Sequence, residues 1–197
     1  MKILLTGGFL GSGKTSFILQ LARRMKEDPR TGDIVIIENE IGEVSVDDKT
    51  LSGAGYEVRT LFSGCVCCTL AGALPPTVLK IQQELDPGWI IMEASGLAFP
   101  SSIRENLETV LGIPCRVCCI ADAQRWKRLH AALEELMRGQ LESADAILVN
   151  KADLVDADTL KGVLAEVREI NDKADVFPLC ANGTIPDELF EAVLGKE

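Results

Sequence analysis

The chain has 197 residues, seven cysteines and a formal net charge of −10 at pH 7. The length suits one domain with a sizeable core, spanning residues 1–197, and the 47% hydrophobic content suits an aliphatic-rich α/β protein. The negative charge disfavours nucleic acid or an anionic membrane as the main partner. No stretch reaches transmembrane length and no signal peptide is present, so we expect a cytoplasmic protein with reduced cysteines.

Apolar β-type runs alternate with helical patterns along the whole chain. The expected strands are Ile3–Thr6, Ile34–Glu38, Glu57–Thr60, Trp89–Glu93, Arg116–Ala121, Ala146–Asn150 and Val176–Leu179. The expected helices are Thr15–Met25, Leu70–Leu85, Ser101–Leu111, Arg125–Met137, Asp156–Ile170 and Pro186–Leu194. This order predicts an α/β fold with a doubly wound, mostly parallel sheet and helices on both faces.

The segment from Gly8 to Thr15 reads GFLGSGKT and matches the phosphate-binding loop pattern G-x-x-x-x-G-K-[ST]. Its glycines let backbone N–H groups curl around an oxyanion, and the following helix adds its dipole. In this pattern Lys14 reaches the β- and γ-phosphates, and the Thr15 hydroxyl is a ligand of Mg²⁺. We therefore predict a P-loop NTPase fold, with a long loop at Gly42–Gly55 over the nucleotide. The expected phosphate-binding residues are Gly11, Ser12, Gly13, Lys14, Thr15 and Ser16.

Asn150-Lys151-Ala152-Asp153 follows an expected strand and has the N-K-x-D arrangement of guanine-binding P-loop proteins. The Asp153 carboxylate can accept both the N1–H and the exocyclic amine of guanine, a donor pair that adenine lacks. The Lys151 stem can lie over the base, and Asn150 can tie this loop to the phosphate loop. Ala181 and Asn182, after the last strand, are placed to offer a backbone N–H to the guanine O6. GTP or GDP is therefore the predicted ligand.

A second element on the phosphate side is the apolar strand that ends at Glu93 and is followed by Ala94-Ser95-Gly96. Glu93 can hold magnesium through water, and Gly96 can approach the γ-phosphate by its backbone. We expect Lys14, Thr15 and Glu93 to carry magnesium-dependent hydrolysis.

Three thiols, Cys65, Cys67 and Cys68, lie within four residues just before an expected helix. Without a disulfide context, such a C-x-C-C cluster suggests a soft-metal site, although it can also be redox-active or merely tolerated. Cys68 tends to point away from Cys65 and Cys67 in an extended loop. A tetrahedral ion then needs ligands from another segment or subunit, and Glu38 and Glu43 are candidates.

The other cysteines and the single histidine are expected to have structural roles. Cys118 and Cys119 fall in an apolar run that reads as a central strand, so we expect Cys115, Cys118 and Cys119 to pack in the core despite the ligand-like C-x-x-C spacing. Both His130 and Trp126 are expected on a helix. We expect His130 to be a surface or half-buried side chain and Trp126 to pack against other side chains.

The chain resembles the CobW-like metallochaperone GTPases, which are related to HypB and UreG. The matching segments run in family order from residue 7 to residue 154 and read GGFLGSGKTSF, IENEIGEVSVD, SGCVCCTL, IIMEASGLAFP, DAQRW and ADAILVNKADL. The resemblance implies GTP hydrolysis coupled to metal binding and delivery to a client protein. It also implies a transition-metal site formed by Cys65, Cys67, Cys68, Glu38 and Glu43, with Zn²⁺ as first choice and Co²⁺ or Ni²⁺ as alternatives.

The chain departs from the family pattern at its C-terminus. Longer relatives carry a further domain, so we expect a homodimer face or a separate protein to take over client recognition. Two alternatives to a metallochaperone stay open: a GTPase assisting a corrinoid (cobalamin) protein, and a GTP-switched interaction module that binds metal incidentally. A small-molecule kinase is a weaker rival, because N-K-x-D argues against it.

Overall fold

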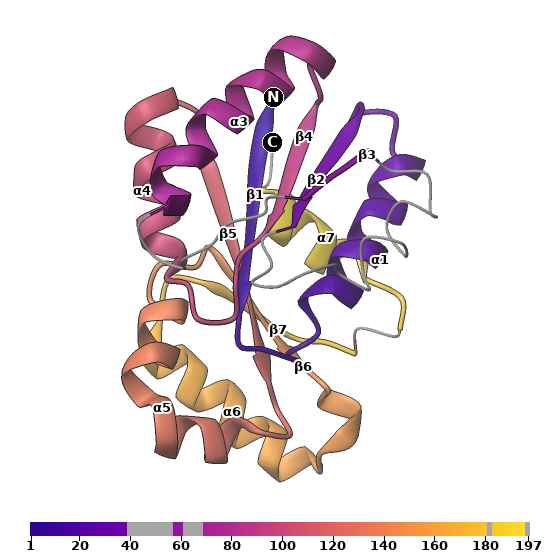
Figure 1. Ribbon diagram of the computed structural model, residues 1–197. Helices are drawn as coiled ribbons and strands as arrows, with labels where there is room; N and C mark the ends of the chain where they lie inside the picture. Colours follow the sequence, from indigo (N-terminus) through magenta and orange to yellow (C-terminus); the bar gives the residue numbers. More distant parts are fainter. Residues whose placement is uncertain (39–56, 61–68, 181–182, 196–197) are drawn as a thin grey trace.

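The computed structural model describes residues 1–38, 57–60, 69–180 and 183–195 (Figure 1). Within these residues, seven parallel strands form one sheet in the order β3-β2-β4-β1-β5-β6-β7. The strands are β1 (Lys2–Gly8), β2 (Ile34–Glu38), β3 (Glu57–Thr60), β4 (Trp89–Glu93), β5 (Cys115–Asp122), β6 (Ala146–Asn150) and β7 (Asp175–Pro178). The predicted doubly wound α/β fold is confirmed.

Helices cover both faces of the sheet, as Figure 1 shows. The helices are α1 (Lys14–Glu27), α3 (Thr69–Leu85), α4 (Pro100–Leu111), α5 (Trp126–Leu141), α6 (Ala157–Ile170) and α7 (Asp187–Leu194), with a short 3₁₀ helix η1 (Ala152–Leu154). The apolar side chains of α1 and α7 pack together on one face, whereas those of α3, α4, α5 and α6 pack on the other. Successive residues of β1 alternate between these two cores, since Ile3 and Leu5 face one and Leu4 faces the other.

Burial on both faces explains why the central strands are continuous apolar runs. All five residues of β6 are buried, and so are the first four of β4, which ends at the half-buried Glu93. Side chains of β5 follow the same rule: Cys118 and Cys119 are fully buried and Cys115 nearly so. The expectation that these three thiols pack in the core is confirmed, and no disulfide joins them.

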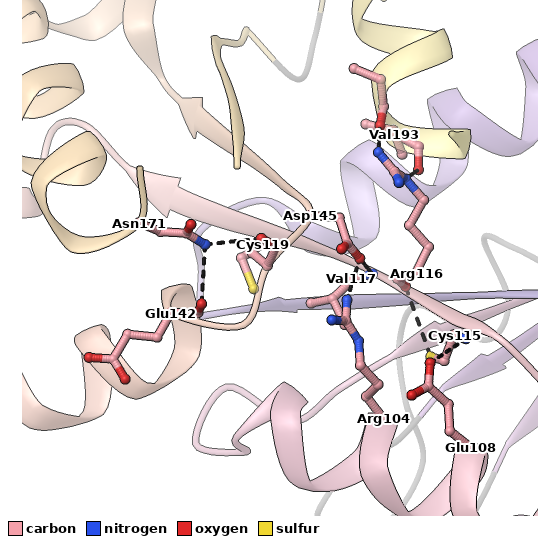
Figure 2. A network of polar contacts seen from close by, with 12 residues as sticks. Arg104, Glu108, Cys115, Arg116, Val117, Cys119, Glu142, Asp145, Asn171 and Val193 are labelled. Atoms are coloured by element: carbon pink, nitrogen blue, oxygen red, sulfur yellow. Dashed lines mark hydrogen bonds and ion pairs between the residues drawn. The ribbon is translucent and has the colours of Figure 1, made fainter. Parts of the chain in front are cut away.

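The amino ends of β5 and β6 are joined by a polar network (Figure 2). The Asp145 carboxylate accepts hydrogen bonds from Arg104 of α4 and from the backbone N–H of Val117. Arg116 donates to the carbonyl oxygens of Ala192 and Val193 at the end of α7, where a cation also suits the helix dipole. This network fixes helices from opposite faces to the same end of the sheet.

The predicted bounds of the strands agree with the structure for β2, β3, β4 and β6 and differ at three others. Strand β1 continues to Gly8 because Gly7 and Gly8 pair with Cys119 and Ile120 of β5. Strand β5 is one residue longer at each end than expected, and β7 lies one residue earlier, at Asp175–Pro178. Helix α5 ends at Leu141 rather than Met137.

Candidate nucleotide-binding site

The carboxyl ends of β1, β4, β5 and β6 bring the sequence-predicted nucleotide residues to one edge of the sheet. Strand β1 lies between β4 and β5, and the chain leaves it toward β2 on one side and later fills the other side with β5 and β6. This is the point at which the strand order reverses, where open α/β sheets bind their ligands. The phosphate-loop residues lie directly after β1 at this position.

The phosphate loop is shaped by glycine conformations and by close backbone approach. Gly8, Gly11 and Gly13 all have positive φ, of 129°, 70° and 100°. A Cβ on Gly8 would lie 2.3 Å from the Ile120 carbonyl oxygen, so no larger residue fits there. Gly13 begins α1 without a side-chain cap, and the first turn carries no acidic residue. The first N–H groups of an α-helix have no acceptor within the helix, so a helix start of this kind can bind an anion.

Lys14, Thr15 and Glu93 meet beside this helix start. The Thr15 hydroxyl donates a 2.9 Å hydrogen bond to Glu93 Oε2, and Lys14 Nζ lies 3.8 Å from Glu93 Oε1. Lys14 is buried, with Nζ also 3.4 Å from the Phe9 carbonyl oxygen inside the loop. The three residues that the sequence assigned to hydrolysis thus form one cluster, although β4 and α1 are far apart in the chain.

The hydroxyl and carboxylate oxygens of Thr15 and Glu93 fit magnesium, which prefers hard oxygen ligands and keeps several waters. Bound there, magnesium would neutralise negative charge on the β- and γ-phosphate oxygens. The partly exposed Thr15 and the exposed Ser16 and Gly11 line the open side of the loop, whereas Ser12 is buried.

The N-K-x-D segment at residues 150–153 is called the guanine loop below. A direct hydrogen bond joins it to the phosphate loop. Asn150 Nδ2 donates to the Ser12 carbonyl oxygen at 2.7 Å, as the sequence analysis expected of Asn150. The Asn150 carbonyl in turn accepts from Ala123 N, and Ala152 N donates to the Leu179 carbonyl oxygen. The next residue, Lys151, has a φ of 60°, which is rare for a residue with a side chain and places the loop in a tight turn. Asp153 then lies exposed in η1, where a base can reach it.

Gly96 lies against the phosphate loop. A Cβ on Gly96 would lie 2.7 Å from the Leu10 backbone nitrogen. The buried Gln140 holds the segment after β4 in place, because its Nε2 donates hydrogen bonds to the carbonyl oxygens of Gly96 and Ala98. Gln140 was not singled out in the sequence, because only the packing of α5 brings it here.

Asp122 and Arg125 are two further residues of this site that the sequence analysis did not assign. Both belong to the matching segment DAQRW, and an acidic residue at the end of an apolar run, as at Glu93, was the available signal. Asp122 Oδ2 accepts from Arg125 Nε at 2.6 Å and from Lys151 Nζ at 2.7 Å. Burial by itself would raise the pKa of the Asp122 carboxyl, but the hydrogen bonds from Lys151 and Arg125 outweigh it and lower that pKa.

Several predicted residues fall outside the described residues. These are Glu43, Cys65, Cys67, Cys68, Ala181, Asn182 and the Gly42–Gly55 loop. Of Glu38 the structure describes the backbone, which ends β2 and pairs in register with Glu93 of β4. Among the described residues no group of three or more His, Cys, Asp or Glu side chains is arranged to hold a metal ion. The other predicted helix residues are as expected: Trp126 is fully buried and donates to Glu166, and His130 is half-buried and stacks on Trp126.

The fold and this edge of the sheet define a P-loop nucleoside-triphosphate-binding domain. The chain belongs to the CobW/HypB/UreG family, whose nucleotide-binding domain matches residues 2–178. The family resemblance expected from the sequence is confirmed.

Among the relatives, a zinc chaperone CobW of Sinorhizobium sp is 35% identical, over 90% of this chain and 58% of its own length. The zinc chaperone YjiA of Escherichia coli (strain K12) is 32% identical, over 90% of this chain and 57% of its own length. The chain therefore spans somewhat more than half the length of these relatives.

Solved structures share the fold. The hydrogenase maturation factor HypB from Archaeoglobus fulgidus has a TM-score of 0.70 and 17% identity, covering 97% of this chain and 87% of its own. The cell division protein FtsY from Thermotoga maritima has a TM-score of 0.67 and 15% identity, covering 99% and 69%. Within the described residues, no helix is both long enough and apolar enough to cross a membrane.

Proposed function

We propose that this chain is a GTP-binding, GTP-hydrolysing metallochaperone domain, which binds a transition metal and delivers it to a client protein. The observation that carries the nucleotide part is the 2.7 Å hydrogen bond from Asn150 Nδ2 to the Ser12 carbonyl oxygen. It holds the N-K-x-D loop against the phosphate loop, so that one nucleotide can occupy both.

Selectivity for guanine rests on Asp153. Its exposed carboxylate follows the left-handed turn at Lys151 and is free to accept both donors of the guanine edge. An adenine base would leave this acceptor unmatched, which costs affinity. Ala181 and Asn182 are proposed to contribute the backbone N–H for the guanine O6.

Hydrolysis is proposed to depend on Lys14, Thr15 and Glu93 and to be slow without a partner. Lys14 places a buried positive charge beside the phosphate loop, and Thr15 and Glu93 supply the oxygens for magnesium. Phosphoryl transfer needs positioning and charge neutralisation more than covalent chemistry, and these residues provide both.

The transition-metal site is proposed at Cys65, Cys67, Cys68, Glu38 and Glu43, with Zn²⁺ as the first choice. Support comes from the relatives named zinc chaperones and from the soft thiolates of the C-x-C-C cluster. A HypB structure from Helicobacter pylori is described as a complex with nickel, so Ni²⁺ or Co²⁺ are the alternatives to test.

Nucleotide and metal are proposed to be coupled through the segment between Glu38 and Cys68. The backbone of Glu38 lies in register beside Glu93, at the same edge as the magnesium ligands. A γ-phosphate can order such a segment and hydrolysis can release it, which would alter the metal ligands. Linkage then requires that metal change the GTP affinity by the same factor. A client metalloprotein, a homodimer and a cytoplasmic location complete the proposal.

The guanine assignment is tested by competition between GTP and ATP for the purified protein. GTP should bind far more tightly, and Asp153→Asn should weaken GTP while favouring xanthine nucleotide, because an amide can donate where the carboxylate only accepted. Equal affinities for ATP and GTP would reject the assignment.

The chaperone assignment is tested by zinc and cobalt titrations in the presence of GDP or a non-hydrolysable GTP analogue. The metal affinity should differ between the two nucleotides, fall on Cys67→Ser, and rise with pH toward the thiol pKa as the ligands lose protons. Identical metal affinities in the two states would leave a plain GTP switch.

A further inference from the structure

Asp122 is a buried carboxylate that links charged hydrogen bonds along the edge of the sheet where the predicted nucleotide residues lie. Its side chain is completely buried, and Oδ2 accepts from both Arg125 Nε and Lys151 Nζ. Oδ1 accepts from the backbone N–H of Arg125 as well. A buried carboxylate with two cationic donors keeps both side chains in fixed positions, because charged hydrogen bonds are short and directional.

Arg125 extends this chain to the phosphate loop. Its Nη2 donates to the Leu10 carbonyl oxygen at 2.7 Å. The guanidinium also lies over Gly11: a Cβ at Gly11 would be 3.3 to 3.7 Å from Nη2, Nη1 and Cζ. The guanidinium therefore lies beside Gly11, and the side chain of any larger residue at this position would contact it.

Lys151 extends the chain in the other direction, to the guanine loop. Its ammonium is held by Asp122 and its backbone is in the left-handed region, two residues before Asp153. Two carbonyl oxygens of the phosphate loop thus accept hydrogen bonds from segments that follow β5 and β6: Leu10 from Arg125 and Ser12 from Asn150.

We propose that Asp122 and Arg125 position the phosphate loop and the guanine loop as one unit, and that Arg125 is a positioning residue for nucleotide binding. This inference rests on the proposed guanine-nucleotide function and adds to it two residues outside the known loop motifs. Arg125 fixes the carbonyl side of the loop, so the opposite N–H groups stay preorganised for phosphate. Asp122 links Arg125 to Lys151 and thereby links the phosphate loop to the loop that would hold the guanine base.

The experiment measures the Kd of GDP and the single-turnover rate of bound GTP for the full chain and for Arg125→Gln, Arg125→Lys and Asp122→Asn. Arg128→Gln is the matched control, because Arg128 is exposed in the first turn of α5, which begins directly after Arg125, and this variant loses the same charge. Arg125→Gln should raise the Kd of GDP roughly tenfold, the size of one lost hydrogen bond from a charged group. The single-turnover rate at saturating GTP should change less than about threefold, since Arg125 acts on binding.

A double variant separates positioning from a general loss of structure. Asp122→Asn should weaken GDP at least as much as Arg125→Gln, and combining the two should add little, because both break the same chain. Arg125→Lys should recover part of the affinity. The melting temperature without nucleotide should stay within a few degrees for both Arg125 variants, and these carry the test if Asp122→Asn does not fold.

The outcomes distinguish the two proposals. If the wild-type chain binds GDP well and Arg125→Gln matches Arg128→Gln, the positioning role is overturned and the guanine-nucleotide function stands. Additive losses in the double variant would likewise overturn the coupling through Asp122. If the wild-type chain does not prefer guanine nucleotides, the proposed function fails, and this inference fails with it.

Discussion

At the scale of single residues, the site depends on side chains that the fold itself buries. Lys14 is only 6% exposed, and its ammonium lies near the Glu93 carboxylate and the Phe9 carbonyl oxygen. The charge is therefore largely shielded from water and lies inside the loop, where it would interact more strongly with phosphate than it would in water.

Lys14→Ala should lower GTP turnover by about 100-fold or more, because it removes this preorganised charge. The measurement is phosphate release with saturating magnesium and GTP. Lys161→Ala, which removes an exposed lysine of α6, is the control and should leave turnover unchanged. Equal turnover in the two variants would show that Lys14 is misassigned.

At the scale of elements, the close approach of the β4–α4 segment to the phosphate loop is set by Gly96. Gly96→Ala should raise the Kd of GDP roughly tenfold, because its Cβ would press on the Leu10 nitrogen and overpacking costs about 1–3 kcal/mol. Titration with a fluorescent GDP analogue measures this change. Gly162→Ala is the matched control, since nothing lies within 4 Å of a Cβ there. That control should stabilise α6 by about 0.5–1 kcal/mol and leave the Kd as it was.

Strand β5 carries three buried thiols, which should resist alkylation in the native protein. Burial raises the pKa of Cys115 and of Cys119 to about 12, and the pKa of Cys118 rises well above its ordinary value for the same reason. The reactive thiolate is therefore scarce at pH 8. Peptide mapping should find these three unmodified until denaturant is added, whereas the partly exposed Cys180 reacts in the native state. Labelling of Cys118 at the rate of Cys180 would contradict the buried position.

The same raised pKa values set a direction for stability at alkaline pH. Below the ordinary thiol pKa of about 9 both the native and unfolded states hold these protons, and above it the unfolded state releases them first. The free energy of unfolding should therefore fall as pH rises from about 9 toward 12. Cys119→Ala should reduce the dependence of the free energy of unfolding on pH, measured by denaturant titrations at several pH values. An unchanged pH dependence would count against a raised pKa of Cys119 in the native state.

Sequence patterns predicted those elements whose residues signal their own structure. The bounds of strand β4 were predicted correctly because WIIME is a continuous apolar run that ends in an acidic residue. The phosphate loop from Gly8 to Thr15 was predictable because its motif lies within eight consecutive residues. An acid at the end of an apolar run was a signal for Asp122, but the contacts that give Asp122, Arg125 and Gln140 their roles were not predictable in this way. Each depends on a contact with a distant segment: the loop after β6, the phosphate loop and the segment after β4. Register and helix packing set these contacts, and a single sequence does not encode them locally.

At the scale of the whole molecule, the site joins two halves of one sheet, so a bound nucleotide should stabilise the entire fold. Ligand at 100 times its Kd adds about 2.7 kcal/mol to the free energy of unfolding. For a chain of this size that corresponds to a rise in melting temperature of roughly 5–10 °C. GDP with magnesium should produce this rise in a thermal melt, and ADP at the same concentration should not. Equal shifts with both nucleotides would argue against guanine selectivity.

The central place of β1 has a consequence for biosynthesis. Strand β1 is synthesised before its sheet partners β4 and β5, which begin only at Trp89 and Cys115. At roughly 5–20 residues per second, β1 waits on the order of 5–20 s for its first sheet partner. During that time its apolar segment has no native partner in the sheet, and transiently exposed apolar surface of this kind favours aggregation. The Asn150 contact with the phosphate loop forms later still, because Asn150 is synthesised after both sheet partners of β1.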